Sequence, residues 1–169
     1  ELPGVTDAAT GTATIWNNIA LFAPEYRRAQ LVALWSSAPN ILFTRAKPVR
    51  SPADMAGMKV RVPSRNAGLV IEAWGGTPVS MPAPEIYNAM QTGVIDGAEN
   101  NPPTFIAHNY MPVAKNYTLS GHFITPEMLL YSKVKWDKLS ADEQQKILVL
   151  AREAQFEQRK LWNAYNDQA

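Results

Sequence analysis

The 169-residue sequence contains no cysteine, which excludes disulfide bonds and thiolate metal sites. It also lacks any run of the ~18 consecutive apolar residues that a membrane-spanning helix needs. Neither sign of charge predominates, because 16 lysines and arginines face 15 aspartates and glutamates, for a net charge of +1. Since nucleic-acid binding usually requires a clustered basic face, DNA and RNA are not expected partners.

Signatures of catalysis and of metal binding are absent as well. The sequence has no Gly-x-Ser-x-Gly elbow, no glycine-rich phosphate loop and no paired zinc ligands. Its two histidines, His108 and His122, do not have metal-ligand spacing. A hydrolase using His122 would need a nucleophile and a base within reach, and the sequence shows no such pair. We therefore expect no enzyme, no metal and no cofactor.

The two ends of the sequence have the character of a cut domain. Residues 1–4 lack the basic start and apolar core of a signal peptide. Residues 161–169 are helix-like and contain no glycine or proline stop signal. We expect the chain to begin and end inside a mature protein.

Strand-like and helix-like segments alternate from about residue 58 to residue 100, which predicts an α/β lobe with a mostly parallel sheet. Ser51, Pro52 and Asp54 form a capping-box start, and Gly57 ends the short turn that follows. The expected helices are about 10–33, 64–74, 84–92 and a long one from 140, and the expected strands are 31–35, 58–62, 79–81, one beginning at 94, 115–119 and 128–134. In the long helix, one buried side is expected, formed by Ile147, Leu150, Ala151, Ala154, Leu161 and Tyr165.

Arg61 is the first candidate binding residue. It ends an alternating strand on the face opposite Met58, Val60 and Val62, and Ser64 opens a helix just beyond it. Ligands of open α/β sheets bind beyond the carboxyl ends of the strands, where a guanidinium can hold a carboxylate with two parallel hydrogen bonds. A surface arginine paired with a nearby acid is the alternative, and position alone favours it.

Two further polar residues follow predicted strands. Asn100 offers both a donor and an acceptor, although Asp-Gly and Asn-Asn-Pro-Pro sequences form turns in any case. His122 lies beside Gly121, and a lone histidine is more often a packing residue than a functional one. Position alone therefore leaves a structural role favoured for both.

Most of the chain resembles the solute-binding proteins of TRAP transporters, the family that includes dicarboxylate and sialic-acid receptors. The matching segments, in order and spacing, are Lys47–Pro63, Gly75–Met81, Glu85–Gly97 and Glu99–Asn100, with weaker likeness at His122 and at residues 136–144. The resemblance implies that Arg61 pairs with a substrate carboxylate and that Asn100 also reaches it. By position in the family pattern, the remaining implied substrate-binding residues are Ser64, Arg65, Ala83, His122 and Glu127.

The sequence departs from the family pattern at one position. Many members carry a second arginine several residues before the Lys-Pro-Val turn, where this chain has Ile41, and Arg45 would point elsewhere. The ligand is therefore expected to bear one carboxylate held mainly by Arg61. Aromatic, keto- or hydroxy-monocarboxylates become as plausible as dicarboxylates.

The resemblance also implies a periplasmic-binding-protein-like fold of two α/β lobes, type II-like, of which this chain holds mostly the second. We expect residues 1–37 to be part of the first lobe, residues 38–125 the second lobe, and residues 126–169 a hinge strand and a long helix that returns to the first lobe. Uncovered apolar surface on such a piece predicts self-association.

The implied function is to capture a small organic acid in the periplasm by hinge closure and to deliver it to the integral membrane permease subunits. No cofactor is implied. The alternative is a ligand-binding sensor domain of a signalling receptor with the same fold, which the neighbouring genes would distinguish.

Overall fold

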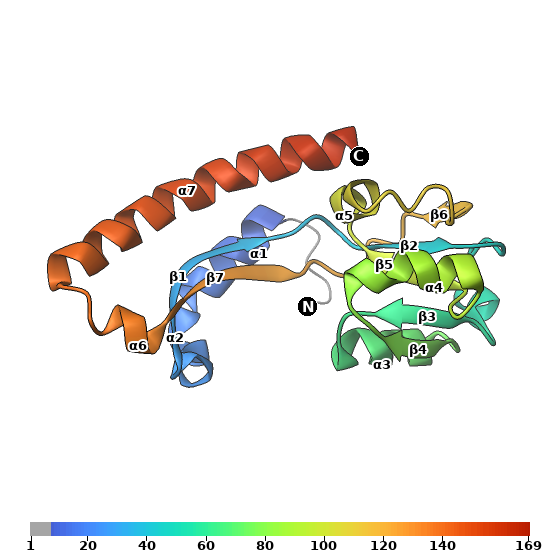
Figure 1. The fold of residues 1–169 in the computed structure, drawn as a ribbon, viewed down its shortest axis with the longest axis horizontal. Coiled ribbons are helices and arrows are strands. Elements are labelled where there is room, and N and C mark those ends of the chain that lie inside the picture. Colours follow the sequence, from blue (N-terminus) through green and yellow to red (C-terminus); the bar gives the residue numbers. More distant parts are fainter. Residues whose placement is uncertain (1–7) are drawn as a thin grey trace. The chain divides into compact units, whose positions relative to one another are not determined.

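A computed structural model describes residues 8–169, which form two compact units (Figure 1). One unit is Pro39–Phe123. The other combines the described residues up to Ala38 with Ile124–Gln168. The chain therefore leaves the two-segment unit after Ala38, forms the whole of the Pro39–Phe123 unit, and returns at Ile124.

The Pro39–Phe123 unit contains a five-stranded sheet in the order β4-β3-β5-β2-β6. Its strands are β2 (Ile41–Thr44), β3 (Lys59–Val62), β4 (Thr77–Ser80), β5 (Gly97–Asn100) and β6 (Asn116–Thr118). Strand β3 pairs in parallel with β4 and β5, whereas β2 pairs antiparallel with β5 and β6. The sheet is therefore mixed: the strands of the alternating segment, β3, β4 and β5, are parallel as predicted, and β2, from outside that segment, runs antiparallel to both of its neighbours.

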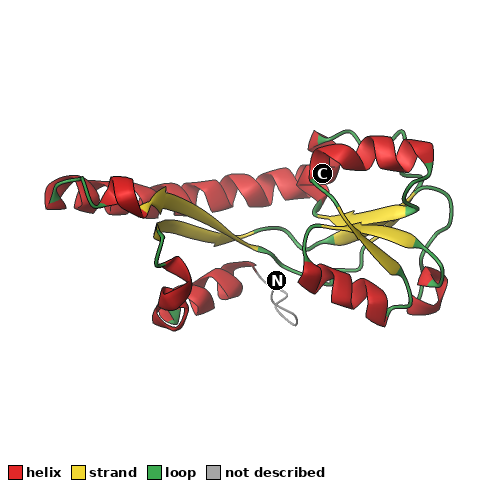
Figure 2. Cartoon of the chain, turned by 60° about the horizontal axis from the view of Figure 1, so that its bottom comes forward, coloured by secondary structure: helices red, strands yellow, loops and turns green. Residues whose placement is uncertain are grey.

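Helices flank this sheet, as Figures 1 and 2 show. They are η2 (Pro52–Met55), α3 (Arg65–Ala73), η3 (Ala83–Glu85), α4 (Ile86–Thr92) and α5 (Pro102–Ala107). The capping box at Ser51 is present, with Asp54 accepting from the Ser51 backbone N–H. Ser64 caps α3 by accepting from the Ala67 N–H at 3.2 Å. Both helix starts were predicted, because capping depends on residues within one turn.

Two apolar clusters pack on opposite faces of the sheet. One contains Phe43 and Ala98 with α4 and the aromatic residues Phe105 and Tyr110. The other contains Leu42 and Val60 with residues of α3 and Phe123. Neighbouring residues of β2, Leu42 and Phe43, belong to different clusters, as the two-residue period of a strand requires. Both faces of the sheet are therefore buried.

Gly97 opens β5 where two backbones approach closely. A Cβ at this position would lie 2.8 Å from the Phe43 carbonyl oxygen and 2.9 Å from Thr44 Cγ2. The sequence predicted that this strand begins at Val94, but β5 begins at Gly97. Residues 101–103 also differ from expectation: Asn101 accepts from the Thr104 N–H at 2.9 Å and starts α5, where only a turn was predicted.

The other unit, which combines the described residues up to Ala38 with Ile124–Gln168, is built on an antiparallel pair of strands. These strands are β1 (Ala29–Ser36) and β7 (Pro126–Ser132). Its helices are α1 (Ala8–Asn17), α2 (Ile19–Phe22), η1 (Ala23–Tyr26), α6 (Lys133–Trp136) and α7 (Ala141–Gln168). The strand expected at 31–35 is confirmed, but the helix expected up to residue 33 is wrong, because helical structure gives way to β1 at Ala29.

Helix α7 packs on β1 within this unit (Figure 1). Ala151 and Gln155 are its buried residues, and Gln155 Oε1 accepts from the Leu34 N–H at 3.0 Å. The predicted buried side was partly wrong, since Leu150 and Leu161 are 62% and 63% exposed. Helical spacing marks an apolar stripe but does not decide which part of it meets β1.

Within residues 8–169, no helix combines the length and apolarity that crossing a bilayer requires. In the same residues, no three histidine, aspartate or glutamate side chains gather as a metal site would need.

Candidate functional site

Arg61 lies on β3 and is only 4% exposed. Its Nε donates to the Met81 carbonyl at 2.8 Å, and its Nη1 donates to the Glu99 carbonyl at 3.4 Å. No carboxylate oxygen in residues 8–169 lies within 4.0 Å of this guanidinium. Three of its five N–H groups have no acceptor in the part of the chain that the structure describes.

Burial lowers the pKa of Arg61, and the charge of Glu99 opposes this shift in part. The guanidinium nevertheless remains protonated, since an arginine titrates far above neutral pH. A cation this buried costs several kcal/mol of solvation free energy unless an anion compensates it. The predicted alternative of a surface arginine paired with an acid does not fit this environment.

Asn100 ends the neighbouring strand β5, one residue after the carbonyl that Arg61 contacts. Ala98 is in register with Arg61, so Asn100, two residues further on, is on the same face of the sheet. Its Oδ1 accepts from the Asn101 N–H at 2.9 Å, which leaves the amide Nδ2 as donor. The two parallel strands thus bring two donor groups to their carboxyl ends.

Ile41 is directly opposite Asn100 in the β2–β5 register and is 3% exposed. This is the position where the family resemblance led us to look for a second arginine. The apolar side chain packs into the cluster with Phe43 and Phe105. Arg45 lies beyond Thr44, which pairs with Gly97 at the other end of β5, so it does not substitute for an arginine at position 41.

Ser64 and Arg65 line a hollow of about 330 Å³ at the start of α3, together with Pro78 and Ser80 near β4. Arg61 is not among the residues lining it. Ala83 begins η3 and packs against the cluster that contains Phe43, while its carbonyl accepts from the Tyr110 hydroxyl at 2.8 Å.

His122 contacts a buried carboxylate on the other face of β5. Its Nε2 is 3.4 Å from Glu99 Oε2, which also accepts from Asn40 Nδ2 at 2.5 Å. Its Nδ1 is 2.8 Å from Ser120 Oγ, and its ring meets Trp74 edge-on at 5.2 Å between centroids. Glu99 is fully buried, and its Oε1 has no hydrogen-bond partner among the described residues. The contacts of His122 are therefore with this cluster and not with Arg61.

Glu127 lies in the other unit, on β7 opposite Trp35. The side chain is half-buried, and burial raises the pKa of its carboxyl group. Of the residues that the sequence suggested, the structure brings Arg61 and Asn100 onto one face of neighbouring strands. Ser64 and Arg65 share a hollow, and Ala83, His122 and Glu127 have separate surroundings.

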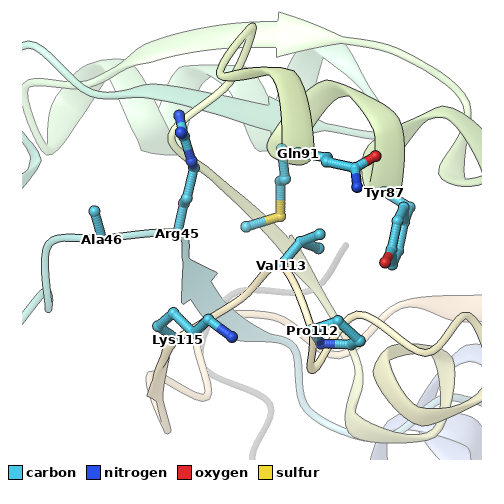
Figure 3. A pocket seen from close by; sticks show the side chains of 8 residues that line it. Arg45, Ala46, Tyr87, Gln91, Pro112, Val113 and Lys115 are labelled. Carbon is cyan, nitrogen blue, oxygen red and sulfur yellow. The ribbon is translucent and has the colours of Figure 1, made fainter.

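A hollow of about 390 Å³ lies at the other ends of these strands (Figure 3). Arg45 and Lys115 stand on one side of it and Tyr87 and Gln91 on the other. The Arg45 guanidinium, however, lies against the end of α4, since a Cβ on Gly93 would be 2.5 Å from its Nη1. Arg45 therefore supports a helix C-terminus, where a cation is favourable, and the hollow is not the site of Arg61.

Sequence reasoning missed four residues around the candidate site: Asn40, Met81, Glu99 and Tyr110. The sequence contained one signal for Glu99, because it is a carboxylate in a short buried strand. A buried charge requires partners, so such a residue is a candidate for a side-chain cluster. Nothing local could identify Asn40 or Tyr110, because each meets its partner, Glu99 or Ala83, from a segment distant in sequence.

Comparison with known proteins adds to this geometry. The family model for bacterial extracellular solute-binding proteins, family 7 (DctP), matches residues 21–169. The chain belongs to this family. The match confirms the resemblance to TRAP solute-binding proteins and, with the structural neighbours, the α/β periplasmic-binding-protein-like fold class. Family members and neighbours are solute-binding proteins and not enzymes.

Two solved TRAP periplasmic solute-binding proteins are close neighbours. The protein from Citrobacter koseri, solved with bound D-glucuronate, is 60% identical with a TM-score of 0.85, over 91% of this chain and 52% of that one. The protein from Pseudomonas putida F1, also solved with D-glucuronate, is 41% identical with a TM-score of 0.85, over 91% and 51%. A solute-binding protein of Chromohalobacter salexigens is 38% identical over 83% of this chain and 43% of its own length. This chain thus spans about half the length of these relatives.

Proposed function

We propose that this protein is the solute-binding component of a TRAP transporter and that it binds a hydroxylated monocarboxylate, of which a hexuronate is the best candidate. The observation that carries the proposal is the buried guanidinium of Arg61, which two main-chain carbonyls hold in place without any carboxylate of residues 8–169 within 4.0 Å. A group in this state is prepared for an anion from outside the protein.

The remaining N–H groups of Arg61 suit a carboxylate. Nε and one Nη1 hydrogen are engaged, so the other Nη1 hydrogen and both Nη2 hydrogens are available. The edge between Nη1 and Nη2 can form two parallel hydrogen bonds with a carboxylate, a geometry that lysine does not reproduce. In our proposal, Asn100 Nδ2 adds a third donor.

The side chains next to these donors indicate the ligand class. Ile41 places a buried apolar side chain where a second cation would hold a second carboxylate, which favours a single acid group. The relatives from C. koseri and P. putida were solved with D-glucuronate, a sugar with one carboxylate. In our proposal, Ser64 and Arg65 are secondary contacts for the rest of the ligand. For Ala83, His122 and Glu127, a ligand contact stays a prediction from the family pattern.

We infer that the two units correspond to the lobes of the family fold, with residues 38–125 in the second lobe, residues 1–37 in the first, and residues 126–169 as hinge strand and long helix. Ligand binding would shift the equilibrium to a closed form, which the membrane permease subunits recognise in the periplasm. Such a receptor requires no cofactor.

Isothermal titration calorimetry tests the proposal on protein expressed from its complete reading frame. D-Glucuronate and D-galacturonate should bind, whereas D-glucose, which lacks the carboxylate, and succinate, which carries two, should bind at least tenfold more weakly. Arg61→Ala should weaken uronate binding by about thirtyfold or more, because about 2–5 kcal/mol is lost when one partner of a buried charge pair is removed. Arg45→Ala is the matched control and should retain wild-type affinity. Unchanged uronate affinity in Arg61→Ala would refute the assignment.

A further inference from the structure

Arg61 and Tyr110 hold the two ends of one short segment. This segment, Met81–Ala83, joins β4 to η3. Its Met81 carbonyl accepts from Arg61 Nε at 2.8 Å, and its Ala83 carbonyl accepts from the Tyr110 hydroxyl at 2.8 Å. The position of the Tyr110 hydroxyl is therefore coupled, through three residues of backbone, to the acceptor that orients the guanidinium.

The Tyr110 ring is itself firmly held. It is 1% exposed, stacks on Phe43 at 5.3 Å between centroids, and meets Phe105 at 6.0 Å. Its backbone N–H donates to the Phe105 carbonyl at 3.2 Å, and its own carbonyl accepts from the Ala114 N–H at 2.8 Å. These contacts leave the ring little freedom, so its hydroxyl is a fixed point for the segment.

The hydroxyl of Tyr110 acts as a donor over the physiological range. Burial raises the pKa of this phenol, and the nearby charge of Arg61 only partly offsets that rise. The group is therefore neutral at neutral pH and donates its single hydrogen to Ala83. Segment 81–83 contains Pro82, which has no N–H of its own, so its carbonyls carry the contacts described: Pro82 accepts from the Glu85 N–H at 3.1 Å, and Ala83 accepts from the Ile86 N–H as well as from Tyr110.

We propose that Tyr110 is a positioning residue for carboxylate binding: through the segment Met81–Ala83, it sets the orientation in which Arg61 receives the ligand. This inference rests on the proposed function and adds a residue that need not touch the ligand. Loss of the hydroxyl would remove one of the two hydrogen bonds that the Ala83 carbonyl accepts, the other coming from the Ile86 N–H, and so would loosen the segment. Arg61 would then lose on binding some of the orientational entropy that it now loses on folding.

A double-mutant cycle measured by calorimetry with D-glucuronate tests the inference. Tyr110→Phe keeps the ring and removes the hydroxyl, and it should weaken binding about three- to tenfold, the range expected for one lost hydrogen bond. Arg61→Lys lacks Nε, so in its background the same substitution should change the remaining affinity by less than about twofold. Tyr117→Phe is the matched control, because this tyrosine also meets Phe105 edge-on, at 5.2 Å, but is 41% exposed.

Equal losses from Tyr110→Phe in both backgrounds would overturn the inference, since a merely structural role gives additive effects. Unchanged affinity in Tyr110→Phe, with affinity lost in Arg61→Lys, would overturn it while leaving the proposed function intact. Unchanged affinity in Arg61→Lys would instead count against the proposed function itself.

A second measurement requires no ligand. The Nε–Hε NMR signal of Arg61, assigned by its absence in Arg61→Lys, should shift in Tyr110→Phe and stay in place in Tyr117→Phe. An unmoved signal in Tyr110→Phe would overturn the coupling independently of binding.

Discussion

Replacing Arg61 with methionine should separate the stability of the ligand-free protein from its ability to bind. Methionine is unbranched and uncharged, although its side chain is shorter than that of arginine. The substitution removes one good charge-assisted hydrogen bond, to Met81 at 2.8 Å, which is worth about 1.5–3 kcal/mol. The second bond, to Glu99 at 3.4 Å, is long and adds little. Against this loss stands the relief of a buried cation, which costs several kcal/mol to desolvate.

These contributions nearly cancel, so the free energy of unfolding without ligand should stay within about 1 kcal/mol of wild type or rise. The response to ligand should differ sharply. D-Glucuronate at 100 times its dissociation constant should add about 2.7 kcal/mol to the wild-type free energy of unfolding and nothing to that of Arg61→Met.

Urea unfolding followed by circular dichroism, with and without D-glucuronate, measures both quantities. Arg45→Met is the control, since Arg45 is an exposed arginine of the same unit at the opposite ends of the strands. Arg45→Met should keep the ligand-induced increase in the free energy of unfolding. A loss of more than about 3 kcal/mol in ligand-free Arg61→Met, the cost of breaking a buried charge pair, would show that Arg61 serves folding and would refute the reasoning.

Two further predictions concern the unit built on β1 and β7. Burial raises the pKa of Glu127, so its ionised form destabilises the folded state, and this penalty is full above the raised pKa and absent below the unfolded carboxyl pKa of about 4. Glu127→Gln should therefore raise the melting temperature at pH 7 but not at pH 3.5, and an equal effect at both pH values would contradict this origin. The 169-residue chain alone should self-associate, because Met128, Leu129 and Leu130 are 43–51% exposed on β7, whose second edge has no partner strand among the described residues. Light scattering coupled to size-exclusion chromatography should show a mass above 18.7 kDa that falls on changing Leu129 to Lys, and a monomer at micromolar concentration would count against it.

Much of the local structure could be predicted from the sequence. The starts at Ser51 and Ser64 depend on hydrogen bonds within one helical turn, so the residues that form them are close together in any fold. The alternation along β3 placed Arg61 opposite Val60 and Val62 before any partner strand was known. Residue order and spacing also sufficed to identify the family, which the match over residues 21–169 confirmed.

Other features depended on partners that no local pattern specifies. The burial of α7 was predicted only in part, because Leu150 and Ala151 are both apolar and only the contact with β1 decides between them. Proline-rich residues 101–103 suit a turn and a first helical turn equally, and the structure shows the helix.

The sequence by itself determined the caps at Ser51 and Ser64, the family and the face of β3 that carries Arg61, because each depends on spacings along the chain. Only the tertiary structure decided the environment of that arginine. Ile41 meets Asn100 across a sheet, and Tyr110 reaches Ala83 from 27 residues away. Such contacts form when separate segments pack on a common core. The burial and orientation of the guanidinium therefore follow from the fold and not from the residues next to Arg61 in sequence.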